Sequence, residues 1–453
     1  MIAGAIHTYT PVSVYINVSP EAFERSFVAG DSPADESALF YKWHTTGRVR
    51  SMAEYTDGPE GSTVPWGSTA LYLILASSLI GIMGVSLISP ILPALRAVFG
   101  VADSRIGLVI TVYTLPGVFL TPFVGLIADR IGRRRAIIPL LFVFGIGGTG
   151  IAFARSFEGV LILRFLQGIG ASGLVTLAVT LIGDFYDGAR QNAVMGLNSS
   201  TVGTGAALYP LIGGALAGIR WNFPFVFFGT GVLIGLVAVA ALPEPDGREP
   251  SDVRTYLSGL GSVLRHPKAL AIFGAIFVVF FVFYGAVQTA LPLLLSDEFG
   301  LSSGQIGLTI AAVAAASAVV SSQYGRLSAW RSAPELIALG FVAYGASLLG
   351  VRVAPSPFWV GISLLAFGVG FGLMMPSIDT TIVTAVSGQL RAGMMGMRTS
   401  VLRLGQTLGP ISFTYVAGVA FVTPTQGYRF LLVACGSAIL LIGVVVYAAL
   451  RGR

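Results

Sequence analysis

Twelve long, predominantly apolar runs constrain this chain more than any other feature. Each run approaches or exceeds the length of about 20 apolar residues that an α-helix needs to cross the hydrocarbon core of a membrane. Unpaired backbone groups are not tolerated in lipid, so hydrogen bonding requires these runs to be helical. The predicted spans are 69–95, 105–128, 136–154, 159–183, 191–217, 222–242, 269–296, 304–325, 333–351, 355–384, 393–420 and 428–450.

The composition supports a membrane protein. Only 11% of the residues are charged, against about 25% in a soluble domain. Lys and Arg outnumber Asp and Glu by 27 to 21, but they lie between the apolar runs, which indicates membrane topology and no nucleic-acid partner. The one cysteine, Cys435, and histidines outside the runs argue against a metal site or metalloenzyme. We therefore expect an all-α integral membrane protein without metal or cofactor.

The polar stretches divide the chain. Residues 1–66 are interpreted as a polar tail, either disordered or translated upstream of a start at Met52. Six spans occupy an N-terminal bundle at 67–243, and a cytoplasmic linker loop is expected at 244–267. The remaining six spans form a C-terminal bundle at 268–453.

An internal repeat relates the two bundles. FGVADSRIGL from Phe99 matches FGLSSGQIGL from Phe299 at an offset of 200 residues. The same offset relates Gly125 to Gly325, Met195-Gly196 to Met395-Gly396, Gly205 to Gly405 and Pro210 to Pro410. Two like-oriented halves predict a pseudo-twofold axis along the membrane normal and a central site reached alternately from each side.

The strongest charge cluster, GLIADRIGRRR from Gly125 to Arg135, lies between the second and third spans. Arginines at the end of a span indicate the cytoplasmic side. Counted over all loops, Lys and Arg favour both termini on the cytoplasmic side of a multi-pass protein in the plasma membrane. The closed two-half arrangement needs no partner subunit, so a monomer is expected.

Three local patterns resemble the major facilitator superfamily, and in particular its twelve-span drug:proton antiporters. They are the loop GLIADRIGRRR, the span 4 sequence RFLQGIG from Arg164, and the span 5 sequence GAALYPLIGG from Gly205. The resemblance covers residues 67–450, and Tyr209 departs from it where that family usually has glycine. It implies a transporter of small molecules that works by alternating access, with protons as coupling partner.

The loop and span 5 supply the gating candidates. By resemblance, the Asp129 carboxylate meets the start of span 11 near Gly393, and Arg130 is expected to pair with Asp184, which would latch the halves together. The two glycines of the loop are expected to permit close approach, and the arginines after them to anchor the loop in the membrane surface. Pro210 is expected to kink span 5 and the glycines around it to allow close packing. The candidates are Gly125, Asp129, Arg130, Gly132, Arg133, Asp184, Gly205, Pro210, Gly213 and Gly214.

A second group of residues is assigned to the substrate or proton pathway. Arg164 lies at membrane depth, where it either contacts substrate, tunes a proton site or snorkels to the headgroups. Asp379 is the carboxylate furthest inside a span; it is either a proton carrier or the structural partner of Arg398 or Arg403. The candidates are Arg164, Gln167, Tyr113, Tyr209, Tyr284, Gln288, Asp379, Arg398 and Arg403.

The sparse charge inside the spans suits lipophilic, neutral or cationic substrates, so the preferred hypothesis is proton-driven efflux of such molecules. Span 1 has no acid between Ala70 and Leu95, which keeps open a solute importer or an uncoupled facilitator. A membrane receptor or scaffold is a more remote alternative, because it would require a large cytoplasmic domain. An enzyme is disfavoured, since the spans hold no cluster of nucleophile, base or metal ligands and no GxxxxGK[ST] nucleotide loop occurs.

Overall fold

The computed structural model describes residues 64–245, 267–385 and 388–451, and every regular element in these ranges is helical. The all-α fold is therefore confirmed for the described chain. The tail predicted at 1–66 and the linker predicted at 244–267 fall almost entirely outside these ranges. Those two segments and the exact bundle boundaries remain predictions.

The predicted spans occur in the expected order. Eleven helices are long and apolar enough to cross a membrane by length and composition. The twelfth, α19, is more polar because Arg391, Arg398 and Arg403 lie along it. The first half consists of α3 (Thr69–Ser86), η3 (Ser89–Ile91), α4 (Leu92–Phe99), α5 (Asp103–Ile106), α6 (Leu108–Ile131), α7 (Arg133–Gly150), η4 (Ile151–Phe153), α8 (Phe157–Phe185), α9 (Gly188–Ile219), α10 (Phe223–Phe227) and α11 (Thr230–Ala241).

The second half repeats this order. It contains one wide-turn π-helix, η5, inside its first span. The elements are α13 (Pro267–Val282), η5 (Phe283–Ala290), α14 (Leu291–Phe299), α15 (Ser303–Ser322), α16 (Tyr324–Trp330), α17 (Ala333–Val353), α18 (Pro357–Ala385), α19 (Gly388–Ala420) and α20 (Pro424–Arg451).

Local sequence explains where several helices begin and end. Ser68 and Ser156 accept hydrogen bonds from backbone N–H groups in the first turns of α3 and α8, which satisfies donors that a helix start leaves unpaired. Gly100 and Gly300 end α4 and α14 in the left-handed conformation, at φ 58° and 63°, where a side chain would be strained. Those two glycines are 200 positions apart, so the repeat extends to the helix ends.

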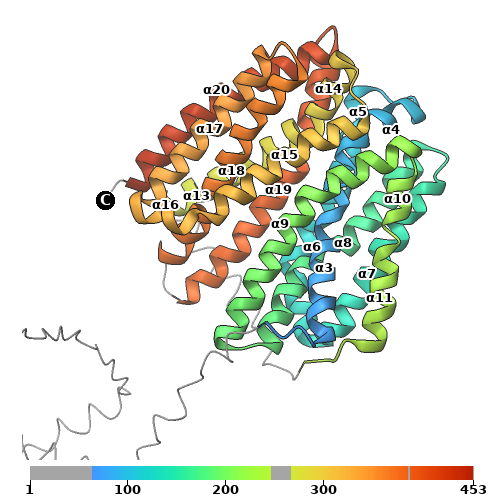
Figure 1. Cartoon of the computed structure of the whole chain (residues 1–453), viewed down its shortest axis with the longest axis vertical. Coiled ribbons are helices and arrows are strands. Elements are labelled where there is room, and N and C mark those ends of the chain that lie inside the picture. The colour runs from blue at the N-terminus through green and yellow to red at the C-terminus, as the bar shows by residue number, and fades with distance from the viewer. Residues whose placement is uncertain (1–63, 246–266, 386–387, 452–453) are drawn as a thin grey trace, which may run out of the picture. The chain divides into compact units, whose positions relative to one another are not determined.

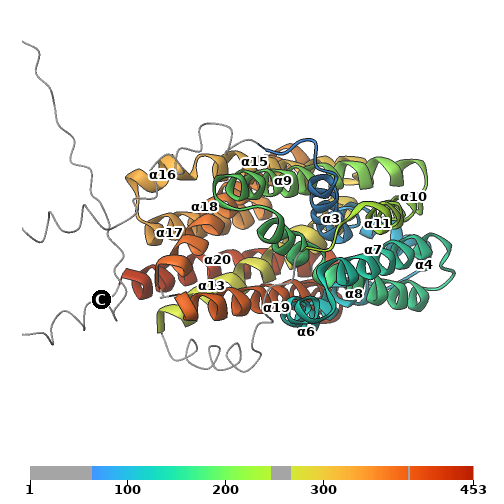
Figure 2. The ribbon, with the colours of Figure 1, turned by 90° about the horizontal axis from the view of Figure 1, so that it is seen from below.

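The two halves meet along two helix pairs, α9 with α15 and α6 with α19. Figure 2 shows the two pairs on opposite sides of the interface. The repeat exchanges the two pairs, because α9 corresponds to α19 and α6 to α15. This arrangement is the one that a pseudo-twofold axis between the halves produces.

The two ends of the helices are easily distinguished. We call the end where α6 meets α7 the basic end, defined by Arg130, Arg133, Arg134 and Arg135. At the opposite end α14 contacts α4, and α19 contacts α5, so the halves are joined there (Figure 1). That the basic end faces the cytoplasm remains a prediction from the arginines.

Candidate functional site

A cavity of about 1270 Å³ lies between the two halves. It is lined by α3, α6, α8 and α9 of the first half and by α13, η5, α15, α18 and α19 of the second. Its lining extends along the helices toward the basic end, as far as Thr180 of α8 and Ser322 of α15. The cavity therefore opens toward the basic end.

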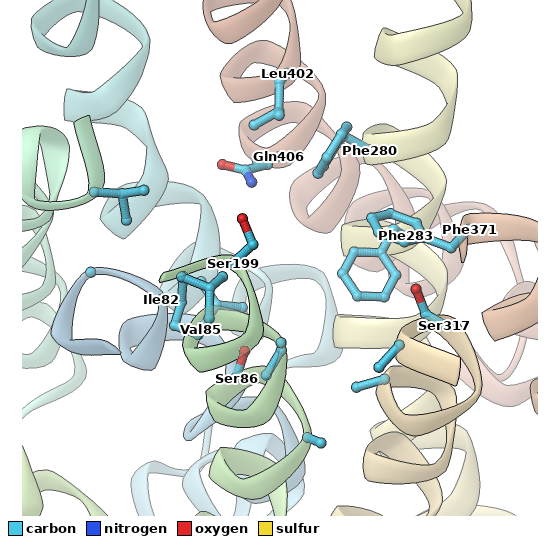
Figure 3. A pocket seen from close by; sticks show the side chains of 18 of the residues that line it. Ile82, Val85, Ser86, Ser199, Phe280, Phe283, Ser317, Phe371, Leu402 and Gln406 are labelled. Carbon is cyan, nitrogen blue, oxygen red and sulfur yellow. The ribbon is translucent and has the colours of Figure 1, made fainter. Parts of the chain in front are cut away.

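The cavity wall is mostly apolar. Figure 3 shows Ile82 and Val85 of α3 facing Phe283 and Phe371 of the second half across the opening. The rings of the second half pack on one another, with Phe280 and Phe371 centroids 5.8 Å apart. Such a wall removes apolar ligand surface from water, as small-molecule sites generally do.

Part of this wall is the π-helix η5, which carries Tyr284 and Gln288 into the cavity lining. A π-turn holds one residue more than an α-turn and occurs frequently at functional sites. The Gln288 side chain is 3% exposed, and its Oε1 has no hydrogen-bond partner among the described residues. Nothing in the sequence of Phe283–Ala290 distinguishes this π-helix, because its composition is that of an ordinary helix.

Polar contacts between the halves close the cavity on the side away from the basic end. The Ser89 hydroxyl donates to the Gln288 carbonyl oxygen at 2.7 Å. The Thr111 hydroxyl donates to the Thr407 carbonyl at 2.9 Å, and the Thr407 and Thr114 hydroxyls lie 3.0 Å apart. These buried bonds need close, aligned helices, so they hold the halves together between the cavity and the opposite end.

An ionic cluster, here called the Arg96 cluster, closes the opposite end. Arg96 Nη1 of α4 lies 2.8 Å from Asp103 Oδ1 of the same half and 2.8 Å from Asp297 Oδ2 of α14. Tyr428 of α20 donates to Asp103 Oδ2 at 2.9 Å. Two residue pairs in this cluster join the halves, Arg96 with Asp297 and Tyr428 with Asp103. The cluster therefore fastens the first half to the second at that end.

Sequence reasoning missed the Arg96 cluster. Its charges lie in or beside short loops, where they were counted only as topology signals. A usable signal existed in the repeat, because Arg96 precedes Phe99-Gly100 and Asp297 precedes Phe299-Gly300. Opposite charges beside the same landmark of two symmetric halves are candidates for pairing across the axis.

Two arginines of α19 reach the cavity. Arg398 forms a two-bonded ion pair with Asp379 of α18, at 2.6 Å and 3.0 Å, so of the two arginines considered as partners of Asp379 it is Arg398 that pairs with it. Arg403 Nη1 donates to Gln406 Oε1 at 3.1 Å, and Gln406 donates to the Tyr284 hydroxyl at 2.9 Å.

The pathway candidates separate into two groups. Five line the cavity and four lie behind its wall. The lining group is Tyr113, Tyr284, Gln288, Arg398 and Arg403, and the group behind the wall is Arg164, Gln167, Tyr209 and Asp379.

Arg164 is 0% exposed, so the snorkelling interpretation is wrong. Its guanidinium donates to the carbonyl oxygens of Gly84 and Val109, each at 2.9 Å, and to Gln167 Oε1 at 2.7 Å. The same group lies 4.3 Å from the centre of the Tyr113 ring. Tyr113 belongs to the cavity lining and Arg164 does not, so Arg164 contacts the lining through the Tyr113 ring.

The basic loop differs from expectation in two respects. Asp184 pairs with Arg133, whose Nε lies 3.0 Å from Asp184 Oδ2, and Arg133 also forms an ion pair with Asp129. The expected Arg130–Asp184 pair is wrong, because Arg130 is the last-turn residue of α6 that faces outward, whereas Arg133 begins α7 beside α8. Arg133 is accordingly more than a membrane anchor.

Close approach is found at one of the two loop glycines. A Cβ on Gly132 would lie 2.8 Å from the Glu244 carboxylate, and Gly132 has φ 102°. A Cβ on Gly125 would meet nothing within 4 Å, so the prediction of a close approach is wrong for Gly125 in this conformation. The Asp129–Arg133–Asp184 contacts lie within the first half, and the surroundings of Gly393 fall outside the described side chains. A latch between the halves at this loop remains a prediction.

The span 5 glycines serve two interfaces. A Cβ on Gly205 or Gly213 would collide with α3-side residues of the same half, Leu79 and Leu87 respectively. A Cβ on Gly214 would collide with the backbone of Ser303 in the second half. The glycines thus hold α9 close both to its own bundle and to its partner.

The sequence of the chain matches known proteins over most of its length. The family model described as "Major Facilitator Superfamily" matches residues 74–410 and 278–453. The bacillibactin exporter of Bacillus subtilis (strain 168) is 25% identical over 349 residues, which cover 73% of this chain and 85% of that protein. The class G tetracycline resistance protein of Vibrio anguillarum is 28% identical over 355 residues, which cover 75% of this chain and 89% of that protein.

The fold is likewise found in solved structures. A bacterial homologue of the human lysosomal transporter Spinster, in an inward-facing and unoccupied conformation, superposes with a TM-score of 0.73 at 19% identity, covering 86% of this chain and 98% of that one. With the helical bundle and the family match, this likeness establishes the class of protein. The chain belongs to the Major Facilitator Superfamily and is a multi-pass membrane transporter, not an enzyme.

Proposed function

We propose that this protein exports lipophilic small molecules across the plasma membrane by alternating access, with proton entry as the driving force. The observation that carries the proposal is the cavity of about 1270 Å³, which is mostly apolar and extends toward the basic end. With the basic end in the cytoplasm, this conformation receives substrate from inside the cell. Export also agrees with relatives named as an exporter and a resistance protein.

Alternating access is supported by the nature of the contacts that close the opposite end. They consist of the Arg96 cluster, hydroxyl–carbonyl bonds and close helix crossings, all between the halves. These contacts can break as a set when one half rocks against the other, while each bundle keeps its own core. A single chain contains both halves, so the proposal is for a monomer.

Asp379 and Arg398 are the proposed site of proton coupling. Asp379 of α18 does not line the cavity itself, but its ion-pair partner Arg398 does. Protonation of Asp379 would release Arg398 into the cavity, and this step would link proton binding to substrate release. Asp379 is also the described carboxylate furthest from the ends of a span.

An uncoupled facilitator is the second candidate, and a specific observation favours it. Among the described lining residues there is no carboxylate, and Asp379 is held by two bonds to Arg398. A carboxylate that never leaves this pair would not carry protons.

The test uses purified protein in liposomes with an imposed pH gradient. Luminal pH and dye content would be followed for an anionic, a neutral and a cationic lipophilic dye, with Asp379→Asn beside the parent. Asp187→Asn is the matched control, because Asp187 is exposed at the start of α9. Dye-dependent proton movement that Asp379→Asn abolishes is expected. Dye transport without proton movement would establish the facilitator, and no transport of any dye would refute both candidates.

A further inference from the structure

We infer that the cavity takes amphipathic organic anions, whose anionic group is bound by Arg403 and whose apolar body lies against Phe280, Phe283 and Phe371. This inference rests on the proposed transport through the cavity. The sequence favoured neutral or cationic substrates, whereas this inference assigns anionic ones.

The charges of the lining are the first argument. Two guanidinium groups, those of Arg398 and Arg403, belong to the described lining, which contains no carboxylate. Asp379 matches the charge of Arg398. Among the described residues, the Arg403 guanidinium has one hydrogen-bond partner, the neutral Gln406 side chain, and its buried Nε has none. One positive charge therefore remains unmatched at the cavity.

A second unmatched charge lies close to the first. Arg164 donates only to carbonyl and amide oxygens in the described chain, and its guanidinium lies over the Tyr113 ring. Arg403 packs on Gly117 of α6, where a Cβ would lie 3.3 Å from the arginine Cδ and Nε. Gly117 is one helical turn from Tyr113, so the two arginines approach the same face of α6, one from each half.

The energetic consequence follows from the low polarity of the site. A cation that is removed from water without a counter-ion is unfavourable, and the cost is offset when an anion forms charge-assisted bonds to it. A cationic ligand would meet two like charges and no described carboxylate to balance it. A neutral ligand would leave Arg403 unmatched. An anion is therefore the ligand that best completes the cavity.

The aromatic side chains of the lining indicate what the rest of the ligand should be. Phe280, Phe283 and Phe371 are lining residues, and their rings contact one another. Tyr284 connects this aromatic wall to the Arg403–Gln406 pair through its hydroxyl group. A ligand with an anionic head at Arg403 would thus place a flat apolar body beside the aromatic wall.

The experiment compares three probes that share one body: pyrenebutyrate, pyrenebutanol and the trimethylammonium derivative of pyrenebutylamine. Binding to detergent-purified full-length protein is measured by calorimetry, with each probe titrated into detergent alone as a blank. The parent should bind the anion about tenfold more tightly than the alcohol, since hydrogen bonds to charged groups contribute that much. The cation should bind most weakly.

Three variants locate the effect. Arg403→Gln should lower pyrenebutyrate affinity about tenfold and leave pyrenebutanol affinity unchanged. Arg403→Lys keeps the charge and should retain most of the preference. Arg326→Gln removes an exposed arginine of α16 and should change nothing. Thermal unfolding of each variant verifies that it is folded.

The inference is overturned if the cation binds as tightly as the anion, if Arg403→Gln keeps the anion preference, or if no probe binds. Transport of pyrenebutanol and pyrenebutyrate into liposomes separates this failure from failure of the proposed function. If both probes cross equally well and independently of Arg403, transport stands and the anion assignment fails. If neither crosses, the proposed function fails with it.

Discussion

Gly307 of α15 packs directly on the carbonyl oxygen of Pro210 in α9, so closely that a Cβ on Gly307 would lie below 3.0 Å from it. The repeat produces the same contact a second time, between Gly107 and the Pro410 carbonyl oxygen. Both contacts join one half to the other. The separation is closer than real Cβ atoms reach, so only glycine allows the crossing.

Gly307→Leu should prevent this crossing. Overpacking a close contact costs about 1–3 kcal/mol, and the cost applies to the conformation in which the opposite end is closed. We expect liposome transport to fall to background. Gly304→Ala in the same helix is the control, because a Cβ there meets its nearest atom at 3.9 Å. A Gly307→Leu variant that transports normally would refute the role of this contact.

Asp297→Asn should weaken closure of the opposite end by removing the cross-half partner of Arg96. Both side chains are partly exposed, at 21% and 26%, so the pair contributes about 1 kcal/mol, or about fivefold in the balance between conformations. In a Cys435→Ser background, Ser317→Cys labels the cavity, and its reaction with a water-soluble maleimide from the basic end should slow.

The control for this measurement is Arg105→Gln. Arg105 pairs with Glu158 at 3.0 Å inside the first half, so its loss should leave the labelling rate unchanged. Equal rates in Asp297→Asn and the parent would show that the Arg96 cluster does not hold the halves together.

Asp379→Asn and Arg398→Gln should each lower the melting temperature, because each leaves one charge without its partner. Asp379 is 43% exposed on its side chain, so the effect is moderated by solvent and is about 1 kcal/mol. The double variant should lose less stability than the sum of the two single changes. Strictly additive losses would mean that the two charges are not coupled.

Arg133→Gln should destabilise the packing of α6, α7 and α8 by about 1–2 kcal/mol, since Arg133 contacts both Asp129 and Asp184. Arg130→Gln is the matched control, because Arg130 takes part in neither of these two ion pairs. It should leave the stability unchanged within error. Thermal unfolding in detergent measures both. A larger effect at Arg130 would restore the pairing expected from the sequence.

The helical framework was predictable because lipid leaves few choices. Twelve runs predicted twelve helices in the right order, and the offset between Phe99 and Phe299 predicted equivalent helix ends at Gly100 and Gly300. Pairing of Asp379 with Arg398 or Arg403 was also predictable, since few ionisable groups lie inside the spans and each needs a partner.

Contacts that depend on three-dimensional register were not predictable. Arg130 and Arg133 lie three residues apart in one basic run, and only the turn at Gly132 decides which of them meets Asp184. Arg164 is bonded to backbone carbonyls, and a sequence does not mark which carbonyl oxygens are within reach. The proposed anionic substrate depends on the same kind of contact, because it rests on Arg403 having no carboxylate partner among the described residues.

The paired Gly107–Pro410 and Gly307–Pro210 crossings have a consequence for the origin of the fold. Each half carries a glycine and a proline, and each residue meets the complementary residue of the other half. That is the pattern of an isologous interface, in which one surface is self-complementary and two identical copies associate about a twofold axis. A chain of half this length would contain both residues that such an interface needs. Duplication followed by fusion would then keep the two copies paired, while the sequence of each copy could diverge. Arg403, the lining arginine without a carboxylate partner among the described residues, corresponds in the repeat to the uncharged Gly203.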